Sequence, residues 1–136
     1  MYDLMIIGSG PAGISAALTA KARNLNFIWF GSRALSTKIE KAEKIMNYPG
    51  LPAVTGSEMQ SVFLKQIDDC DITITEAQVN SIYDCGGYFA AGAENEIYEA
   101  KSVIMTVGMT TTREIEGEER LLGCGVSYCA TCDGAL

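Results

Sequence analysis

A glycine-rich turn near the N-terminus constrains the fold more than any other feature of the sequence. The apolar run Leu4–Ile7 predicts a short buried strand, and the segment after the turn carries Ala and Ile at helical spacing. The turn itself reads Gly8-Ser9-Gly10-Pro11-Ala12-Gly13. Pro11 lacks an N–H and therefore suits the first turn of a helix. With a second strand predicted at Phe27–Phe30, this region forms a βαβ-like unit.

The Gly-x-Gly-x-x-Gly pattern gains its meaning from its place between a strand and a helix. Gly8 permits the tight turn, Gly10 lets the backbone approach a pyrophosphate, and Gly13 lets the helix touch the strand. The free N–H groups of the first helical turn can then bind the anion. The pattern predicts a dinucleotide site, and the alternative is a plain glycine-rich turn without a ligand.

The second predicted strand lacks the carboxylate that commonly holds a ribose hydroxyl in such a site. It ends in Phe30-Gly31-Ser32-Arg33. Ser32 or backbone groups would therefore have to replace the carboxylate. Arg33 either faces a phosphate or is a solvated loop charge, and the sequence leaves both interpretations open.

A polar loop and an amphipathic helix follow. Gly and Pro residues in 31–53 predict a loop with one short helix. Met59, Phe63 and Ile67 recur every four positions, which predicts a helix over Ser57–Asp69 with Ser57 as its N-cap.

The next segment is typical of short strands separated by Gly and Asn. We expect strands at Ile72–Thr75, Val79–Tyr83, Tyr88–Ala91 and Ile97–Tyr98, which together form a small β-meander. A last buried strand is predicted at Ser102–Val107, ending at Gly108 and followed by a polar linker over 109–123. Strands and helices in this order place the chain in the α/β class.

Composition and charge exclude several classes of function. The 136 residues suffice for one domain with a core, and 48% of them are apolar. The formal charge of -7 opposes nucleic acid and anionic lipid surfaces. No apolar run approaches the roughly 20 residues of a membrane helix, and Asp3 and Gly8 do not fit a secretory signal. We therefore expect a cytoplasmic protein without a nucleic-acid or membrane partner.

Two cysteines near the end of the chain carry the second chemical signal. Cys129-Ala130-Thr131-Cys132 is a Cys-x-x-Cys dithiol, and Asp133 follows as a possible proton carrier in a chain without histidine. In a reducing cytosol a disulfide of this kind is typically catalytic. The alternative is half of a zinc site, for which Cys124 is the nearest further ligand.

The other two cysteines, Cys70 and Cys85, are interpreted as small buried hydrophobes. We predict no metal site.

Three motifs together resemble the low-molecular-weight thioredoxin reductases. They are Gly8-Ser9-Gly10-Pro11-Ala12-Gly13, Asn47-Tyr48-Pro49-Gly50 and Cys129-Ala130-Thr131-Cys132-Asp133-Gly134. The resemblance implies a Rossmann-like, three-layer FAD-binding fold with a small β-meander, incomplete here and ending just inside a second, nucleotide-type domain. It implies residues 1–112 as the first part of the FAD domain and residues 113–136 as the start of an inserted domain, with a hinge near Thr112–Gly117.

The resemblance also implies roles for individual residues. Cys132 would face the flavin, Cys129 would attack the substrate disulfide, and Asp133 would donate a proton. Asn47 would lie near the isoalloxazine ring and the backbone around Val79 near the adenine. The implied cofactor-binding set is Gly8, Ser9, Gly10, Pro11, Ala12, Gly13, Gly31, Ser32, Lys38, Asn47, Val79 and Gly108.

The chain departs from the family pattern in two places. Thr106-Val107-Gly108 stands where the family has Ala-Thr-Gly, and Leu35-Ser36-Thr37-Lys38 replaces a Gly-Gly-Gln flavin contact. Four segments are more similar to the ferredoxin-dependent flavin thioredoxin reductases than to the NADPH-using branch. They are Leu35-Ser36-Thr37-Lys38, Gly31-Ser32, Val107-Gly108-Met109 and Gly123-Cys124-Gly125-Val126-Ser127-Tyr128.

The implied function is a flavin-dependent disulfide oxidoreductase that passes electrons from FAD through Cys129 and Cys132 to thioredoxin or a similar disulfide protein. Its electron donor would be ferredoxin or NADPH, and the parent protein would be a homodimer. We expect the 136 residues alone to lack turnover. The alternative from a different class is a non-catalytic nucleotide-binding module whose dithiol acts as a redox sensor or metal clip.

Overall fold

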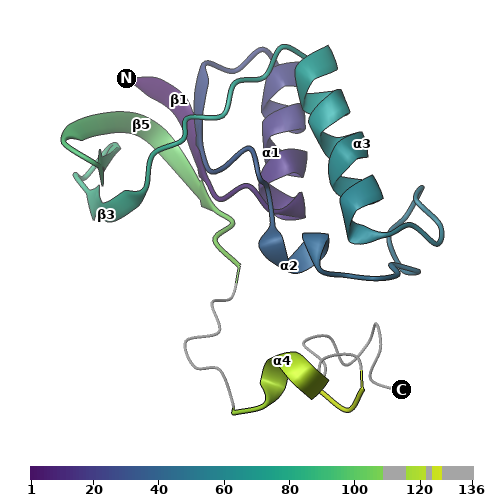
Figure 1. Ribbon diagram of the computed structural model, residues 1–136. Coiled ribbons are helices and arrows are strands. Elements are labelled where there is room, and N and C mark those ends of the chain that lie inside the picture. Colours follow the sequence, from purple (N-terminus) through teal and green to yellow (C-terminus); the bar gives the residue numbers. More distant parts are fainter. Residues whose placement is uncertain (109–115, 122–123, 127–136) are drawn as a thin grey trace.

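The computed structural model describes residues 1–108, 116–121 and 124–126. Two helices cover one face of a central sheet and a β-meander covers the other, which gives three layers (Figure 1). The elements are β1 (Tyr2–Ile7), α1 (Pro11–Ala22), β2 (Phe27–Phe30), α2 (Thr37–Glu40), α3 (Gly56–Asp69), β3 (Val79–Asp84), β4 (Phe89–Ala93), β5 (Glu96–Met105) and α4 (Glu118–Leu121). The predicted Rossmann-like α/β fold with a small meander is confirmed.

One mixed sheet of five strands runs through the molecule in the order β2-β1-β5-β4-β3. β2, β1 and β5 are parallel, whereas β3, β4 and the start of β5 form the antiparallel meander. β5 belongs to both parts, because Ala100 pairs with Tyr2 of β1 and with Phe89 of β4. Ala100 is fully buried, so its small side chain lets the meander lie close to the parallel strands.

The expectation of separate strands at Ile97–Tyr98 and Ser102–Val107 is wrong. Ile97–Tyr98 and residues 102–105 belong to the single strand β5, which is ten residues long. Glu99 and Lys101 lie between them at exposed positions on either side of buried Ala100. Side chains alternate between the faces of a strand, so exposed charges do not end it.

Two other boundaries also differ from prediction. The second meander strand is β4 at Phe89–Ala93 rather than Tyr88–Ala91. Ile72–Thr75 forms only one isolated parallel bridge, between Thr75 and Phe30. The Thr75 N–H donates to the Trp29 carbonyl at 2.7 Å, and the Gly31 N–H donates to the Thr75 carbonyl at 3.2 Å. This extended segment therefore borders β2 at the end that leads into the Gly31 loop.

β1 is buried on both faces, as the continuous apolar run predicts. Leu4 and Ile6 point into the cluster under the helices, whereas Met5 and Ile7 point into the cluster under the meander. On the helical side the cluster also contains Ile14, Ala17, Ala20, Trp29, Phe63 and Ile67. On the meander side it contains Ile28, Phe30, Ala91, Ala93 and Ala100. Phe30 and Tyr98 meet edge to face with ring centroids 5.0 Å apart.

The N-cap of α3 is Thr55 and not the predicted Ser57. The Glu58 N–H donates to Thr55 Oγ1 at 3.3 Å, and the Thr55 N–H donates to Glu58 Oε2 at 2.8 Å. This reciprocal capping box satisfies two backbone donors of the helix end. Ser57 lies inside the helix because α3 already begins at Gly56.

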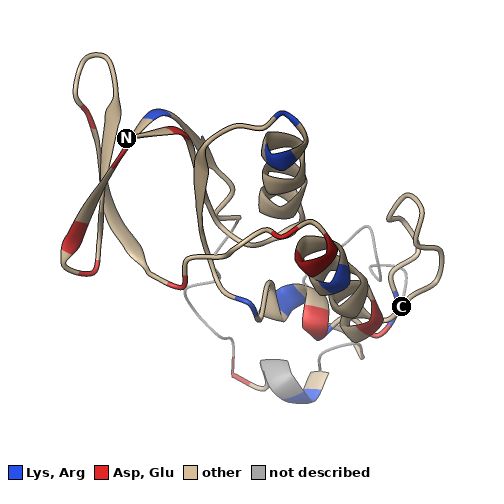
Figure 2. Ribbon diagram, turned by 90° about the horizontal axis from the view of Figure 1, so that it is seen from above, with Lys and Arg blue, Asp and Glu red and all other residues tan. Residues whose placement is uncertain are grey.

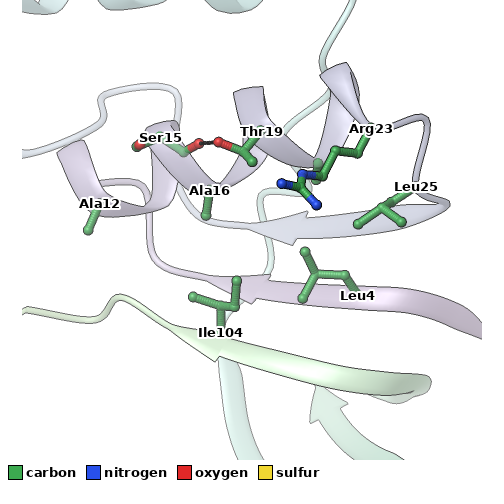
Figure 3. Close-up of a pocket in the computed structure, with 9 residues that line it drawn as sticks. Leu4, Ala12, Ser15, Ala16, Thr19, Arg23, Leu25 and Ile104 are labelled. Carbon is green, nitrogen blue, oxygen red and sulfur yellow. Dashed lines mark hydrogen bonds between the residues drawn. The ribbon is translucent and has the colours of Figure 1, made fainter.

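The C-terminal half of β5 is not the buried strand that was predicted. Ile104 is 40% exposed, Met105 63% and Val107 60%. An apolar hollow lies between α1 and β5, where Leu4 and Ile104 face Ala12 and Ala16 (Figure 3). A strand is buried only when a layer covers each face. The buried cluster under the helices takes Leu4 and Ile6 from β1 and Trp29 from β2, and none of its buried members comes from β5.

Lys and Arg positions are spread along the described part of the chain. In the ribbon they lie on α1, α2 and α3 and in other segments rather than in one stretch (Figure 2). Several are paired with carboxylates, such as Lys101 with Asp3 at 2.6 Å. Within the described ranges, no helix has the length and apolar character needed to cross a membrane.

Candidate functional site

The three parallel strands end at the same edge of the sheet. Ile7, the last residue of β1, pairs with Phe30 at the end of β2 and with Met105 at the end of β5. The residues that follow are therefore neighbours, namely Gly8, Gly31 and Thr106. Crevices at the carboxyl ends of parallel strands are where open α/β sheets bind ligands.

Two glycines of the turn are enclosed by other backbone. Gly8 has φ +114°, and an added Cβ there would lie 2.4 Å from the Thr106 carbonyl oxygen. An added Cβ at Gly13 would lie 2.0 Å from the Gly8 carbonyl oxygen. Both distances are too short for a side chain, so helix α1 and strand β1 approach as closely as the pattern requires.

Gly10, in contrast, borders open space. It is the N-cap of α1, has an extended backbone with φ -72° and ψ 179°, and carries no side-chain cap. No heavy atom lies within 4 Å of an added Cβ. The first helical hydrogen bond joins the Ile14 N–H to the Gly10 carbonyl at 3.0 Å. The N–H groups of Ala12 and Gly13 therefore have no partner inside the helix, and N–H groups in this position can donate to an anion.

Two side chains that sequence analysis did not select hold this turn. Trp29 Nε1 donates to the Gly8 carbonyl at 2.8 Å. Thr106 Oγ1 lies 2.9 Å from the Ile7 carbonyl and 3.1 Å from the Gly8 carbonyl. Trp29 sits in an apolar strand, where it suggested core packing alone. The signal was the indole N–H, because a buried Trp needs an acceptor.

Ser9 and Ser32 were predicted to bind the cofactor, and the structure places them in contact with each other. Ser9 is 8% exposed. Its hydroxyl accepts from the Ser32 N–H at 3.0 Å and donates to the Leu35 carbonyl at 3.1 Å. The Ser32 hydroxyl accepts from the Ala34 N–H at 3.1 Å. The Ser9 hydroxyl is therefore engaged within the protein, whereas Ser32 lies exposed in the loop after β2.

Arg33 forms an ion pair at the surface. Its guanidinium contacts both carboxylate oxygens of Asp68 on α3, at 3.0 and 3.1 Å. Its backbone N–H donates to Glu76 Oε1 at 2.8 Å. The geometry favours the interpretation of Arg33 as a surface charge. It also brings the Glu76 carboxylate to the loop after β2, although β2 itself ends without one.

The remaining predicted residues lie in several different segments. Lys38 lies exposed on α2, and Asn47 lies exposed in a loop closed by the Ile45–Val54 bridge. Val79 is the first residue of β3, half-buried in the meander layer. Gly108 has φ +67°, and an added Cβ there would meet no heavy atom within 4 Å.

The structure thus brings Gly8–Gly13, Gly31, Ser32 and Gly108 to one edge of the sheet. Asn47 and Val79 come from other parts of the fold. Tyr48, next to Asn47, packs on Phe63 of α3 with ring centroids 5.5 Å apart, which anchors the loop to the helical layer.

Cys129, Cys132 and Asp133 lie outside the described residues, as does most of the predicted hinge at 112–117. Within the described ranges, no group of three or more His, Cys, Asp or Glu residues could hold a metal ion. Cys70 is half-buried at the end of α3, and Cys124 is exposed. Cys85 is exposed in the turn after β3, so the prediction of a buried Cys85 is wrong.

The fold and the glycine turn place the chain among proteins with a Rossmann-like FAD-binding α/β fold. The family model described as "pyridine nucleotide-disulphide oxidoreductase" matches residues 2–136. The chain therefore belongs to the pyridine nucleotide-disulphide oxidoreductase family.

Similar proteins agree with this family assignment. A thioredoxin reductase of Bacillus subtilis is 31% identical over 137 residues, covering 100% of this chain and 43% of the relative. Among solved structures, a ferredoxin-flavin thioredoxin reductase from Clostridium acetobutylicum is 48% identical with a TM-score of 0.80, covering 99% of this chain and 47% of that one. Thioredoxin reductase from Streptococcus pyogenes is 37% identical with a TM-score of 0.85, covering 99% and 44%. The chain spans less than half the length of these proteins.

Proposed function

We propose that this chain is the first part of a flavin-dependent disulfide reductase that acts on thioredoxin or a similar protein. The observation that carries the proposal is the open turn at Gly10, which follows β1 at the edge of the parallel sheet where β2 and β5 also end. The likeness to thioredoxin reductases over nearly the whole chain supports it.

The donor groups at this edge fit FAD. The N–H groups of Ala12 and Gly13 and the positive end of the α1 dipole suit the pyrophosphate. Space beside Gly10 allows a phosphate to approach the backbone. Backbone groups of Gly31 and Ser32 would face the adenosine ribose, and Asn47 and Val79 would meet the two ring systems. FAD, when bound and reduced by the electron donor, would supply the two electrons that a disulfide needs for reduction.

The dithiol would carry these electrons to the substrate. Reduction of the Cys129–Cys132 disulfide by two electrons and two protons gives two thiols, one of the protons passing through Asp133. The Cys129 thiolate then attacks the disulfide of the substrate protein and forms a mixed disulfide. Cys132 attacks Cys129 Sγ, which re-forms the Cys129–Cys132 disulfide and releases the reduced substrate.

We further propose the division of the parent protein at residues 1–112 and 113–136, a homodimeric assembly and a cytosolic location. A hinge between the parts would let the dithiol face the flavin at one stage and the substrate protein at another. The Clostridium acetobutylicum protein, named a ferredoxin-flavin thioredoxin reductase, supports ferredoxin as a partner.

The two thiols should differ in their effect on the flavin, because only one of them faces it. In the full-length protein, we expect Cys132→Ser to abolish the spectral change that a thiol contact imposes on the flavin. Cys129→Ser should retain that change yet stop disulfide reduction. The measurement is the visible absorption spectrum of each variant with its flavin oxidised, with thioredoxin reduction assayed in parallel.

Identical flavin spectra in the two variants would contradict this division of roles. Purified protein that contains stoichiometric zinc and no flavin would overturn the proposed function itself.

Ferredoxin is the proposed electron donor, ahead of NADPH. The support is the 48% identity with the ferredoxin-flavin enzyme and the loop Leu35-Ser36-Thr37-Lys38 in place of Gly-Gly-Gln. Anaerobic titration of the full-length protein should bleach the flavin with reduced ferredoxin and leave it oxidised with NADPH. Prompt bleaching by NADPH and none by ferredoxin would contradict this assignment.

A further inference from the structure

The Ser9 side chain links two segments of the candidate site that are 23 to 26 residues apart in the sequence. It is 8% exposed, and its hydroxyl uses both an acceptor and a donor function. The Ser32 N–H donates to it at 3.0 Å, and it donates to the Leu35 carbonyl at 3.1 Å. Both partners are backbone groups of the loop after β2, so the hydroxyl fixes the two ends of the Ser32–Leu35 segment.

Gly31 brings the same loop into direct contact with Ser9. An added Cβ at Gly31 would lie 2.5 Å from Ser9 Cβ and 2.8 Å from Ser9 Oγ. The loop therefore rests on the Ser9 side chain through packing as well as through hydrogen bonds.

The loop also needs an external constraint. Leu35 is 9% exposed and has φ +54°, in the left-handed region that disfavours a residue with a Cβ. Conformations of this kind persist when surrounding contacts hold them. The Ser9 hydroxyl bonds to the carbonyl of Leu35 itself.

We propose that Ser9 is a positioning residue that holds the Ser32–Leu35 loop against the pyrophosphate turn and does not itself bind the cofactor. This inference rests on the proposed FAD site. β2 offers no carboxylate for the ribose, and the N–H groups of Gly31 to Leu35 all donate within the protein. The Ser32 hydroxyl and the carbonyl groups of this loop would therefore face the ribose, and such groups bind well only when their positions are fixed in advance.

The first test compares Ser9→Ala with wild-type protein, without added FAD. Loss of the hydroxyl should raise hydrogen exchange at the Ser32 amide about ten-fold or more, since that amide loses its acceptor. The Met59 amide, which donates to the Thr55 carbonyl in α3, should be unchanged. Ser61→Ala is the matched control, because its hydroxyl bonds only the Ser57 carbonyl of its own helix.

The second test measures FAD affinity in the full-length protein. Ser9→Ala should weaken binding about ten-fold, the effect expected when a fixed hydrogen-bonded loop becomes free. Ser61→Ala should bind as wild type does. Ser9→Thr keeps the hydroxyl. An FAD affinity closer to that of wild type than to that of Ser9→Ala would support the role of the hydrogen bonds.

A pair of substitutions tests the packing contact. Gly31→Ala should lower the Tm and weaken FAD binding, because its Cβ collides with Ser9 Cβ. Ser9→Gly removes that collision, so the double variant should be no less stable than Gly31→Ala alone, although Ser9→Gly by itself is destabilising. If the loss of Tm in the double variant equals the sum of the losses in Gly31→Ala and Ser9→Gly, the proposed contact is overturned.

The outcomes separate this inference from the proposed function. Unchanged exchange at Ser32 in Ser9→Ala overturns the positioning role, whether or not FAD binds. If Ser9→Ala raises exchange at the Ser32 amide as expected but the wild-type protein binds no FAD, the FAD site is overturned. The role of Ser9 in cofactor binding is then overturned with it.

Discussion

At the scale of single residues, the three glycines of the turn have different physical reasons to be glycine. Gly8 and Gly13 lack room for a side chain, with added Cβ atoms 2.4 Å from the Thr106 carbonyl oxygen and 2.0 Å from the Gly8 carbonyl oxygen. Gly10 has room in this structure. The sequence pattern predicted these distinct roles but could not show which atoms enclose Gly8, because Thr106 is almost 100 residues away in the sequence.

This difference predicts that an added methyl group destabilises the protein strongly at Gly13 and only slightly at Gly10. Gly13→Ala should lower the free energy of unfolding by about 3 kcal/mol or more, since overpacking of a close contact forces the backbone to move. Gly10→Ala should change it by less than about 0.5 kcal/mol, the range typical of surface substitutions. Denaturant unfolding of the two variants without cofactor measures both values. Equal losses in the two variants would contradict the geometry.

At the scale of elements, sequence patterns predicted the presence of helices and strands better than they predicted where each one begins and ends. Periodic Met59, Phe63 and Ile67 predicted α3, and all three are buried. The N-cap was misplaced because Thr55 and Ser57 are equally good capping types, and Glu58 three residues after Thr55 was the deciding signal. β5 was divided in two because its pairing changes from β4 to β1 at Ala100, which depends on tertiary contacts.

The capping box of α3 predicts an acid-dependent contribution to stability. Hydrogen bonds from the Thr55 backbone and side chain hold the pKa of Glu58 below its ordinary value of 4.5. A lowered pKa means that the stabilisation is present above the ordinary value and is lost as the pH falls through the folded-state value. Glu58→Gln should therefore lower the Tm at pH 7 and make little difference at low pH.

Thr55→Ala provides the control for this prediction. It should cost about 1 kcal/mol at neutral pH, as loss of an N-cap typically does. In that background Glu58→Gln should have a smaller effect, because the carboxylate has lost the hydroxyl of residue 55 and keeps only its backbone N–H. A pH-independent difference between wild type and Glu58→Gln would contradict the role of the carboxylate.

At the scale of the whole molecule, the sequence was sufficient to predict the three layers and the glycine turn between β1 and α1. The alternation within β1, with Leu4 and Ile6 on one face and Met5 and Ile7 on the other, requires both a helical layer and a second layer. Contacts between distant segments could not be predicted, such as Trp29 with the Gly8 carbonyl and Ser9 with Leu35. The exposure of Ile104 could not be predicted either, because the apolar content of a strand does not show which neighbouring elements cover it.

The central claim is that the turn at Gly10 binds the pyrophosphate of FAD. Gly10→Val in the full-length protein tests it most directly, because the added side chain enters open space and blocks only the ligand. Gly87→Val is the matched control, since Gly87 also borders open space but lies in the turn between β3 and β4. The measurement is the flavin content of each purified protein, from its absorption spectrum, beside the Tm of its cofactor-free form. We predict that Gly10→Val loses the flavin with an unchanged cofactor-free Tm while Gly87→Val retains it; full flavin content in Gly10→Val would contradict the assignment.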